Sequence, residues 1–326
     1  MNPLRVALLG ATGETGSSIL QGLLAEKDKF QVEALVRPTS VEKPQVKKIV
    51  DAGVKIRVAD ATSSPEDLAT VLGGVDILIS AIDAWSQLQQ KNLATAAKMA
   101  GVKRFLPCAF TTIAPPGGVM LLRDDKEEVY EHVKSIGLPY TIVDVGYWYQ
   151  LSFPTVPSGR VDYAAVLKHT DIHGDGEAPN LLTDLRDIGR FVARIIVDDR
   201  TINQYVYVWG EVLTENQIFA MLEELSGEKI QRNYVKDREI QSQVSSAKAR
   251  YAEKPYDAMS RMLMYRSQYK HSKYVRRDNQ PKVAKELGYL DARELYPDLQ
   301  PVSFREFLIE LLDGKITKPY YSNKNM

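Results

Sequence analysis

The stretch that decides the fold is LRVALLGATGETG, residues 4–16, in which an apolar run passes directly into a turn with three glycines. The apolar run predicts a β-strand, and residues 17–25 predict a helix behind the turn. Glycines at this junction allow a tight turn and let a pyrophosphate approach the N-terminus of the helix. Turns before helices also use glycine for purely structural reasons, but the position in the first strand–helix unit favours a dinucleotide site. The expected contacts are Gly10, Ala11, Thr12, Gly13, Glu14, Thr15 and Gly16.

Similar short apolar runs recur along the first half of the chain, at residues 32–36, 54–58, 75–82, 104–106 and 140–145. They are rich in β-branched residues and do not alternate with polar ones, which is typical of parallel strands buried on both faces. Segments of helical period lie between them. Ser64 and Pro65 mark a helix start, and Gly101 marks the end of a helix over residues 86–100. We therefore expect an α/β fold with a Rossmann-type, doubly wound parallel sheet.

The pattern changes after residue 153, where Pro154, Pro157 and Gly159 break the chain into loops. We expect a dinucleotide-binding domain over residues 1–153 and a smaller, mostly helical substrate or lid domain over residues 154–326. Residues 187–210, with a helix at 187–197 and a strand at 205–209, should pack back onto the first domain. Farther along, the sequence Thr214-Glu215-Asn216-Gln217 has the form of a capping box that opens another helix.

Composition narrows the class of protein. The 326 residues are 44% hydrophobic and 26% charged, as in an ordinary globular protein, and the formal net charge is zero. No overall field therefore attracts nucleic acid or an anionic membrane. The single cysteine, Cys108, excludes an intramolecular disulfide and fits a reducing compartment. No secretory signal and no apolar run of ~20 residues is present, so we expect a cytoplasmic protein without a membrane span.

The end of the second predicted strand indicates which dinucleotide is bound. Sites that prefer NAD carry an acidic residue there for the ribose 2′-hydroxyl, whereas an arginine accommodates a 2′-phosphate. This chain has Arg37 at that point, with Lys43 and Lys47 downstream. A solvated surface arginine is the alternative interpretation. We predict NADP(H) as the cofactor, held in part by Arg37 and Lys43.

Several fragments together resemble one known family. They are Ala34-Leu35-Val36-Arg37, Val75-Asp76-Ile77-Leu78-Ile79-Ser80-Ala81, Lys103-Arg104-Phe105-Leu106-Pro107, Leu138-Pro139-Tyr140-Thr141, His173-Gly174-Asp175-Gly176, Asp187-Ile188-Gly189-Arg190 and Asp199-Arg200-Thr201-Ile202-Asn203. In order and spacing they are similar to the NmrA-like, isoflavone-reductase-like atypical short-chain dehydrogenases. One departure is Cys108-Ala109-Phe110, where plant relatives carry Ser-Glu-Phe.

The resemblance implies an NADPH-dependent reductase of a small aromatic or polyketide-like secondary metabolite. Relatives reduce enones, quinone-methide-like ethers or carbonyl groups, with the cofactor over the C-terminal edge of the sheet. The smaller part of the chain would close over the substrate. We expect further cofactor contacts at strand ends of the matching fragments, from Ser80, Ala81, Pro107 and Cys108.

Two lysines compete for the proton-transfer role that hydride transfer requires. Tyr130 and Lys134 spell the Tyr-x-x-x-Lys motif of ordinary short-chain dehydrogenases, but Lys134 lies just before Leu138, where the helix leads into the next strand. Lys126 lies some three helical turns before Leu138, at ~3.6 residues per turn, so it approaches the C-terminal edge of the sheet. It also matches the lysine to which the family assigns general acid/base work, whereas Leu122 stands where a tyrosine partner would lie. A surface lysine paired with acidic neighbours, or a contact to the nicotinamide ribose, remains an alternative for Lys126.

Aromatic residues that follow strand ends are candidates for the substrate pocket: Phe110, Tyr147, Trp148 and Phe153. Each could equally be ordinary core. Cys108 fits a small buried residue beside the cofactor better than a nucleophile, because no histidine stands in a supporting pattern. The histidines at positions 132, 169, 173 and 271 lack metal-ligand spacing, so we expect no metal.

Residues 229–277 carry many more cations than anions, with tyrosines interleaved. Such a stretch suits a nucleic-acid surface, a solvated helical face, or a lid helix that binds an anionic substrate or the cofactor phosphates. We favour the solvated face and do not expect a nucleic-acid partner. The family also contains a non-catalytic NADP(H)-sensing regulator of the NmrA type, which is the rival function. The presence of Lys126 favours an enzyme, with a small-molecule substrate and a monomeric or homodimeric state.

Overall fold

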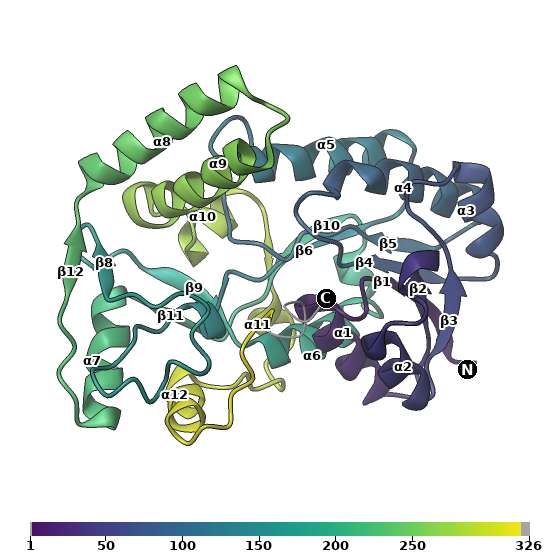
Figure 1. Ribbon diagram of the computed structural model, residues 1–326. Coiled ribbons are helices and arrows are strands. Elements are labelled where there is room, and N and C mark those ends of the chain that lie inside the picture. Colours follow the sequence, from purple (N-terminus) through teal and green to yellow (C-terminus); the bar gives the residue numbers. More distant parts are fainter. Residues whose placement is uncertain (1, 321–326) are drawn as a thin grey trace.

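A parallel sheet forms the centre of the computed structural model, which describes residues 2–320 (Figure 1). Its first five strands have the order β3-β2-β1-β4-β5. They are β1 (Leu4–Leu9), β2 (Phe30–Val36), β3 (Lys55–Val58), β4 (Ile77–Ser80) and β5 (Arg104–Leu106). The bridge between Phe105 and Tyr140 adds β6 (Thr141–Asp144), which pairs in parallel with β10 (Gln204–Tyr207) and through it with β13 (Leu290–Asp291). The predicted doubly wound parallel sheet is confirmed.

Both faces of the sheet are buried, which explains why its strands do not alternate in polarity. On β1, Val6 and Leu8 face one core and Ala7 and Leu9 face the other. The first core contains helices α1 (Glu14–Leu24), α2 (Pro44–Asp51) and α6 (Leu185–Ile195), and the second contains α3 (Pro65–Val71), α4 (Gln90–Met99) and α5 (Leu121–Ser135). Figure 1 shows these two groups of helices on opposite sides of the sheet.

The local signals in the sequence correspond to real helix ends. The Ser64 side chain caps α3, Gly101 has φ +73° directly after the cap of α4, and Thr214 with Gln217 forms the capping box of α7 (Glu215–Ser226). Two starts differ from the prediction. Helix α1 begins inside the glycine turn at Glu14, and the segment expected as one helix from residue 86 begins with a 3₁₀ turn, Gln87–Gln89, before α4.

Helices α1 and α6 cross so closely that only glycine fits between them. A Cβ on Gly189 would lie 1.8 Å from the Ser18 carbonyl oxygen, and one on Gly22 would lie 2.2 Å from the Gly189 carbonyl oxygen. The Ser18 hydroxyl accepts the Gly189 amide and donates to the Leu185 carbonyl. This crossing fixes α6, from the second half of the chain, against α1, the helix that starts in the glycine turn.

The rest of the second half forms a smaller body beside the C-terminal edge of the sheet. Its strands are β7 (Tyr147–Trp148), β9 (Asn180–Thr183) and β11 (Glu211–Leu213) in one sheet, and β8 (Asp171–His173) with β12 (Asn233–Val235) in another. Its helices are α7, α8 (Asp237–Glu253), α9 (Ala258–Lys270), α10 (Pro281–Glu286) and α12 (Phe304–Leu312), whereas α11 (Ala292–Leu295) packs in the first core of the parallel sheet. Helix α9 continues into a π-helical turn, His271–Arg276. The division of the chain at residue 153 stays a prediction.

Candidate active site

The glycine turn lies between the end of β1 and the start of α1. Gly10 has φ +84°, and a Cβ there would lie 2.3 Å from the Ala81 carbonyl oxygen. A Cβ on Gly16 would lie 2.0 Å from the Gly10 carbonyl oxygen, and the Gly13 amide donates to that oxygen at 2.9 Å. The turn is therefore as tight as backbone contact permits, with the unpaired amides of the first turn of α1 at its end. Such a helix start suits the anionic pyrophosphate of a dinucleotide.

Arg37 and Lys43 follow β2 along the same edge of the sheet. Arg37 is exposed, and Lys43 is half-buried at the start of α2. Hydrogen bonds from Thr62 lower the pKa of Asp60, and the charge of Arg37 lowers it further. Lys47 forms an ion pair with Glu42 at 3.1 Å. Arg37 and Lys43 therefore place two positive charges shortly after β2, and neither forms an ion pair with a carboxylate of the described residues.

The ends of β4 and β5 continue this edge of the sheet, and the residue after β4 is packed against the glycine turn. Ser80 is fully buried, and the Ala81 carbonyl is the group that abuts Gly10. After β5 and Pro107, the Cys108 amide donates to the side-chain oxygen of Gln90 at 2.7 Å, and its thiol donates to the Ile82 carbonyl at 3.2 Å.

Lys126 lies on α5 with only 3% of its surface exposed. Its Nζ donates to the carbonyl oxygens of Cys108 at 2.6 Å and Ala109 at 2.9 Å, and to Oε1 of Gln87 at 3.2 Å. Burial lowers the pKa of Lys126, whereas the nearby Cys108 and Asp144 oppose that shift. An ammonium with three acceptors and a lowered pKa is held in place and gives up a proton more readily than a solvated lysine.

The acidic neighbours of Lys126 have other partners. Asp124 accepts the amides of Gly117 and Gly118, and Asp125 accepts the Tyr265 hydroxyl at 2.8 Å and pairs with Arg261. Glu127 pairs with Arg123 at 2.6 Å. The structure therefore gives Lys126 no exposed ion pair with these neighbours.

The Tyr-x-x-x-Lys motif does not form a catalytic pair. Tyr130 is fully buried in the core, whereas Lys134 donates to Glu131 at 2.8 Å and to the Tyr205 hydroxyl at 3.2 Å. Burial raises the pKa of Tyr130, which works against the phenolate form that such a motif uses.

A network that sequence reasoning missed lies beneath Lys126. Arg123 donates to Asp144 at 2.7 Å and to the Tyr289 hydroxyl at 2.8 Å, and that hydroxyl donates to Asp144 at 2.7 Å. Asp144, at the end of β6, is fully buried, and Arg123 is 2% exposed. Asp144 at the end of β6, with Arg123 on the preceding helix, was the available signal, but Tyr289 is too distant in sequence to be paired with them.

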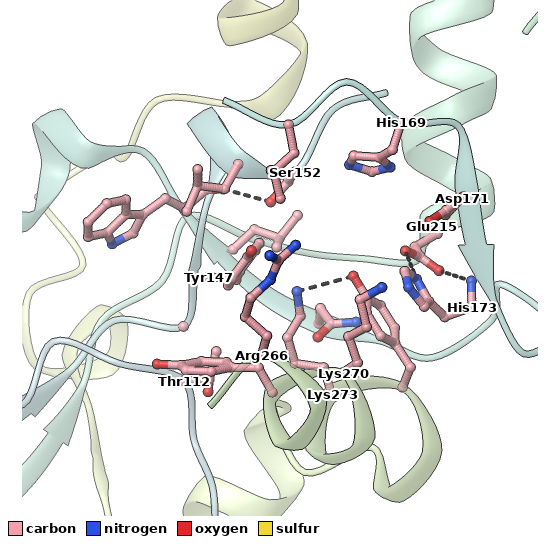
Figure 2. Close-up of a pocket in the computed structure, with 18 of the residues that line it drawn as sticks. Thr112, Tyr147, Ser152, His169, Asp171, His173, Glu215, Arg266, Lys270 and Lys273 are labelled. Carbon is pink, nitrogen blue, oxygen red and sulfur yellow. Dashed lines mark hydrogen bonds and ion pairs between the residues drawn. The ribbon is translucent and has the colours of Figure 1, made fainter. Parts of the chain in front are cut away.

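A cavity of about 660 Å³ opens beside these strand ends (Figure 2). Phe110, Tyr147 and Trp148 line it, together with Ala84, Leu122 and Tyr320 among others. The Tyr320 amide donates to Oε1 of Glu14 at 2.7 Å, so the cavity wall reaches the glycine turn. Phe153 does not line the cavity. It packs in the core of the smaller body, with its ring centre 5.9 Å from that of Phe307.

The far wall of the cavity carries polar residues that the sequence did not single out as a site. Glu215, the first residue of α7, accepts His173 Nδ1 at 2.9 Å and the His173 amide at 2.6 Å. Tyr274 stacks on the His173 ring with centres 4.2 Å apart. Lys273 donates to the Tyr274 hydroxyl at 3.1 Å.

Within residues 2–320, which the structure describes, no group of three or more histidine, cysteine or carboxylate side chains gathers in a way that could hold a metal ion. None of the described helices is both long and apolar enough to cross a membrane.

Comparison with known proteins gives the family. The model of the NmrA-like family matches residues 3–308. The chain belongs to the NmrA-like family. It is 40% identical to asnovolin J 5′,6′-dehydrogenase of Aspergillus novofumigatus, over 95% of this chain and 96% of that protein. It is 26% identical to the probable pinoresinol-lariciresinol reductase 3 of Arabidopsis thaliana, over 94% and 97% of the two chains. The predicted resemblance and the predicted oxidoreductase class are confirmed.

A solved structure of another protein shares this fold. The complex of leucoanthocyanidin reductase with NADPH from Vitis vinifera has a TM-score of 0.79 at 22% identity, covering 95% of this chain and 99% of that one. Such a likeness shows a shared fold. NADPH bound to that fold agrees with the prediction of NADP(H) as the cofactor.

Proposed function

We propose that this NmrA-like protein transfers a hydride between NADP(H) and a C=C or C=O group of a small aromatic or polyketide-like secondary metabolite. Lys126 is the general acid or base of that reaction. The observation that carries the proposal is the buried ammonium of Lys126, which donates to Gln87 and to the carbonyls of the two residues directly before Phe110 in the cavity wall.

The residues present fit the cofactor. Gly10–Gly16 and the start of α1 receive the pyrophosphate, because the helix start offers free backbone amides to an anion. A side chain at Gly10 or Gly16 would collide with backbone and open the turn that presents them. Arg37 and Lys43 bind the 2′-phosphate, and Ser80, Ala81, Pro107 and Cys108 line the path toward the nicotinamide. When bound, the nicotinamide supplies or accepts the hydride.

The cavity holds the substrate. Its volume of about 660 Å³ lies within the usual range of small-molecule sites, and Phe110, Tyr147 and Trp148 offer ring faces to an aromatic or conjugated body. Lys126 stands one layer behind this wall, because the carbonyls of Cys108 and Ala109 that hold its Nζ directly precede Phe110. Proton transfer therefore requires a substrate oxygen or a water to replace one of these carbonyl acceptors.

The direction of the reaction follows from the substrate supplied. One relative is named a dehydrogenase and the other a reductase, and the same hydride geometry serves both directions. In reduction Lys126 donates a proton to the substrate, and in oxidation it accepts one.

The test is a two-way screen. NADPH consumption is followed with enones, quinones and aryl ketones, and NADP⁺ reduction is followed with their saturated or alcohol counterparts, while NADPH binding is measured separately by fluorescence. Turnover in either direction that disappears in Lys126→Met supports the proposal. Tight NADPH binding with no turnover in either direction contradicts it and indicates the non-catalytic sensor.

A further inference from the structure

The basic stretch at residues 229–277 separates into two sets of side chains. Five of its arginines form ion pairs with carboxylates outside the cavity lining: Arg232 with Glu223, Arg250 with Asp257, Arg261 with Asp125, Arg276 with Asp278 and Arg277 with Asp175. Arg266, Lys270 and Lys273 instead line the cavity. They follow one another at i, i+4 and i+7 along α9 and its π-helical extension. Figure 2 shows all three reaching from this one helical segment into the cavity.

The three cations lie at increasing depth. Arg266 is exposed, Lys270 is half-buried, and Lys273 is only 4% exposed. Nζ of Lys273 lies 3.2 Å from the centre of the Tyr147 ring, which is a cation–π contact, and donates to the Tyr274 hydroxyl. An ammonium buried against two phenols, without a carboxylate, lacks the counter-charge that buried cations normally have.

The acidic groups that face the cavity are bound to other residues. Both oxygens of Glu215 accept from His173, and Asp171 accepts the Asn233 side chain at 2.7 Å. Glu215 still exerts its charge on Lys273, and the neighbouring Lys270 opposes it. Among the ion pairs of the described residues, none joins a carboxylate to one of the three cavity cations.

We propose that the substrate of this cavity carries a carboxylate. Arg266 and Lys270 contact it from the side of the cavity mouth, and Lys273 contacts it from the deeper side. The planar guanidinium and the two ammonium groups supply charge-assisted hydrogen bonds to such an anion. Tyr147 and Trp148 hold its apolar body. The inference rests on the proposed function, because it names the substrate class of the same cavity.

The environment of Lys273 adds a measurable consequence. Burial lowers the pKa of Lys273 to about 7, with Glu215 opposing the shift and Lys270 adding to it. The other groups that face it are the phenols of Tyr147 and Tyr274 and the His173 ring, which Glu215 binds. A bound carboxylate stabilises the charged amine, so binding of an acid slightly above neutral pH takes up part of a proton.

The experiment compares two probes of nearly equal shape, cinnamate and cinnamamide, by calorimetric titration of the full chain loaded with NADP⁺. We expect the acid to bind at least about tenfold more tightly than the amide, as loss of a charge-assisted hydrogen bond predicts. Arg266→Gln and Lys270→Gln should each remove most of this preference. Lys254→Gln, an exposed cation of the same stretch outside the cavity, is the matched control and should keep it.

Titrations in two buffers of different ionisation enthalpy measure proton uptake. We expect uptake with cinnamate slightly above neutral pH, and none with cinnamamide or in Lys273→Met. Equal affinities for the two probes, no binding of cinnamate up to its solubility, or a preference that survives in Arg266→Gln and Lys270→Gln would each overturn the inference. The result is independent of hydride transfer, because binding is read without turnover. Unchanged NADPH affinity in the variants separates substrate binding from a role with the cofactor phosphates.

Discussion

The replacement of Lys126 by methionine tests the proton transfer that the proposed reaction requires. The change removes the ammonium that donates to Cys108, Ala109 and Gln87 while it keeps most of the side-chain volume. General acid catalysis contributes about 10²–10⁴-fold to the rate. At 1.36 kcal/mol for each factor of ten, Lys126→Met should raise the activation free energy by roughly 3–5 kcal/mol.

The effect on stability should be smaller than the effect on turnover. Each carbonyl left without its donor costs about 1–3 kcal/mol, but loss of the buried charge offsets this because the ammonium no longer has to be desolvated. The assay therefore pairs kcat with the melting temperature and with the NADPH dissociation constant. Lys134→Met is the matched control, because that lysine lies on the same helix, bonds to Glu131 and Tyr205, and does not line the cavity.

A second substitution separates proton transfer from positioning. Lys126→Arg keeps the charge and donors but does not release a proton near neutral pH, so it should be as slow as Lys126→Met. In the wild type, reduction needs the protonated lysine, and burial lowers its pKa from 10.5. The rate should therefore fall as the pH rises through a value below 10.5, and this limb should be absent in Lys126→Met. Turnover within a few-fold of wild type in Lys126→Met, or full activity in Lys126→Arg, would refute the acid/base role.

Three other predictions concern the cofactor, the helix crossing and the cavity. Arg37→Ser should weaken NADPH binding by about ten- to a hundredfold, the worth of a charge-assisted hydrogen bond, and leave NADH binding unchanged in the same fluorescence titration; equal losses for both would exclude the phosphate contact. Gly189→Ala should lower the free energy of unfolding by about 1–3 kcal/mol or more in urea titrations, because the new Cβ meets the Ser18 backbone; an unchanged midpoint would show that the helices can move apart. Lys273→Met should raise stability at pH 6, by at most about 5 kcal/mol, because the folded wild type there protonates an amine whose pKa is lowered to about 7; this gain should shrink as the pH rises from about 7 toward 10.5, and a gain independent of pH would contradict it.

Local patterns in the sequence determine most of the sheet and the glycine turn. Apolar runs without alternation identify parallel strands, and the turn is recognisable because Gly10 and Gly16 stand where backbone meets backbone. Helix ends at Ser64 and Thr214 follow from side-chain caps that lie within a few residues. Helix α1 starts earlier than the sequence pattern predicts, because its first turn contains no apolar residue and belongs to the glycine turn itself.

Features that depend on distant segments were not predictable in this way. An aromatic residue after a strand end faces either a cavity or a core, and Phe153 faces the core because Phe307, from α12, packs against it. The same limit applies to the basic stretch. Its composition allowed a solvated face, and only the position of α9 over the cavity separates Arg266, Lys270 and Lys273 from the cations that pair with carboxylates elsewhere.

The buried network next to Lys126 shows how the two halves of the chain combine in one site. Arg123 lies one helical turn before Lys126 on α5, so the ion pair with Asp144 fixes the rotation of the helix and with it the direction of the Nζ. A buried ion pair gives little net stability, because desolvation of two charges cancels much of their attraction. Its value here is orientation, and Tyr289, which bonds to both partners, makes that orientation depend on the C-terminal part of the chain. The position of the proposed proton donor is thus set by packing between the two halves, whereas the glycine turn is closed mainly by backbone contacts among Gly10, Gly16 and Ala81, all in the first half of the chain.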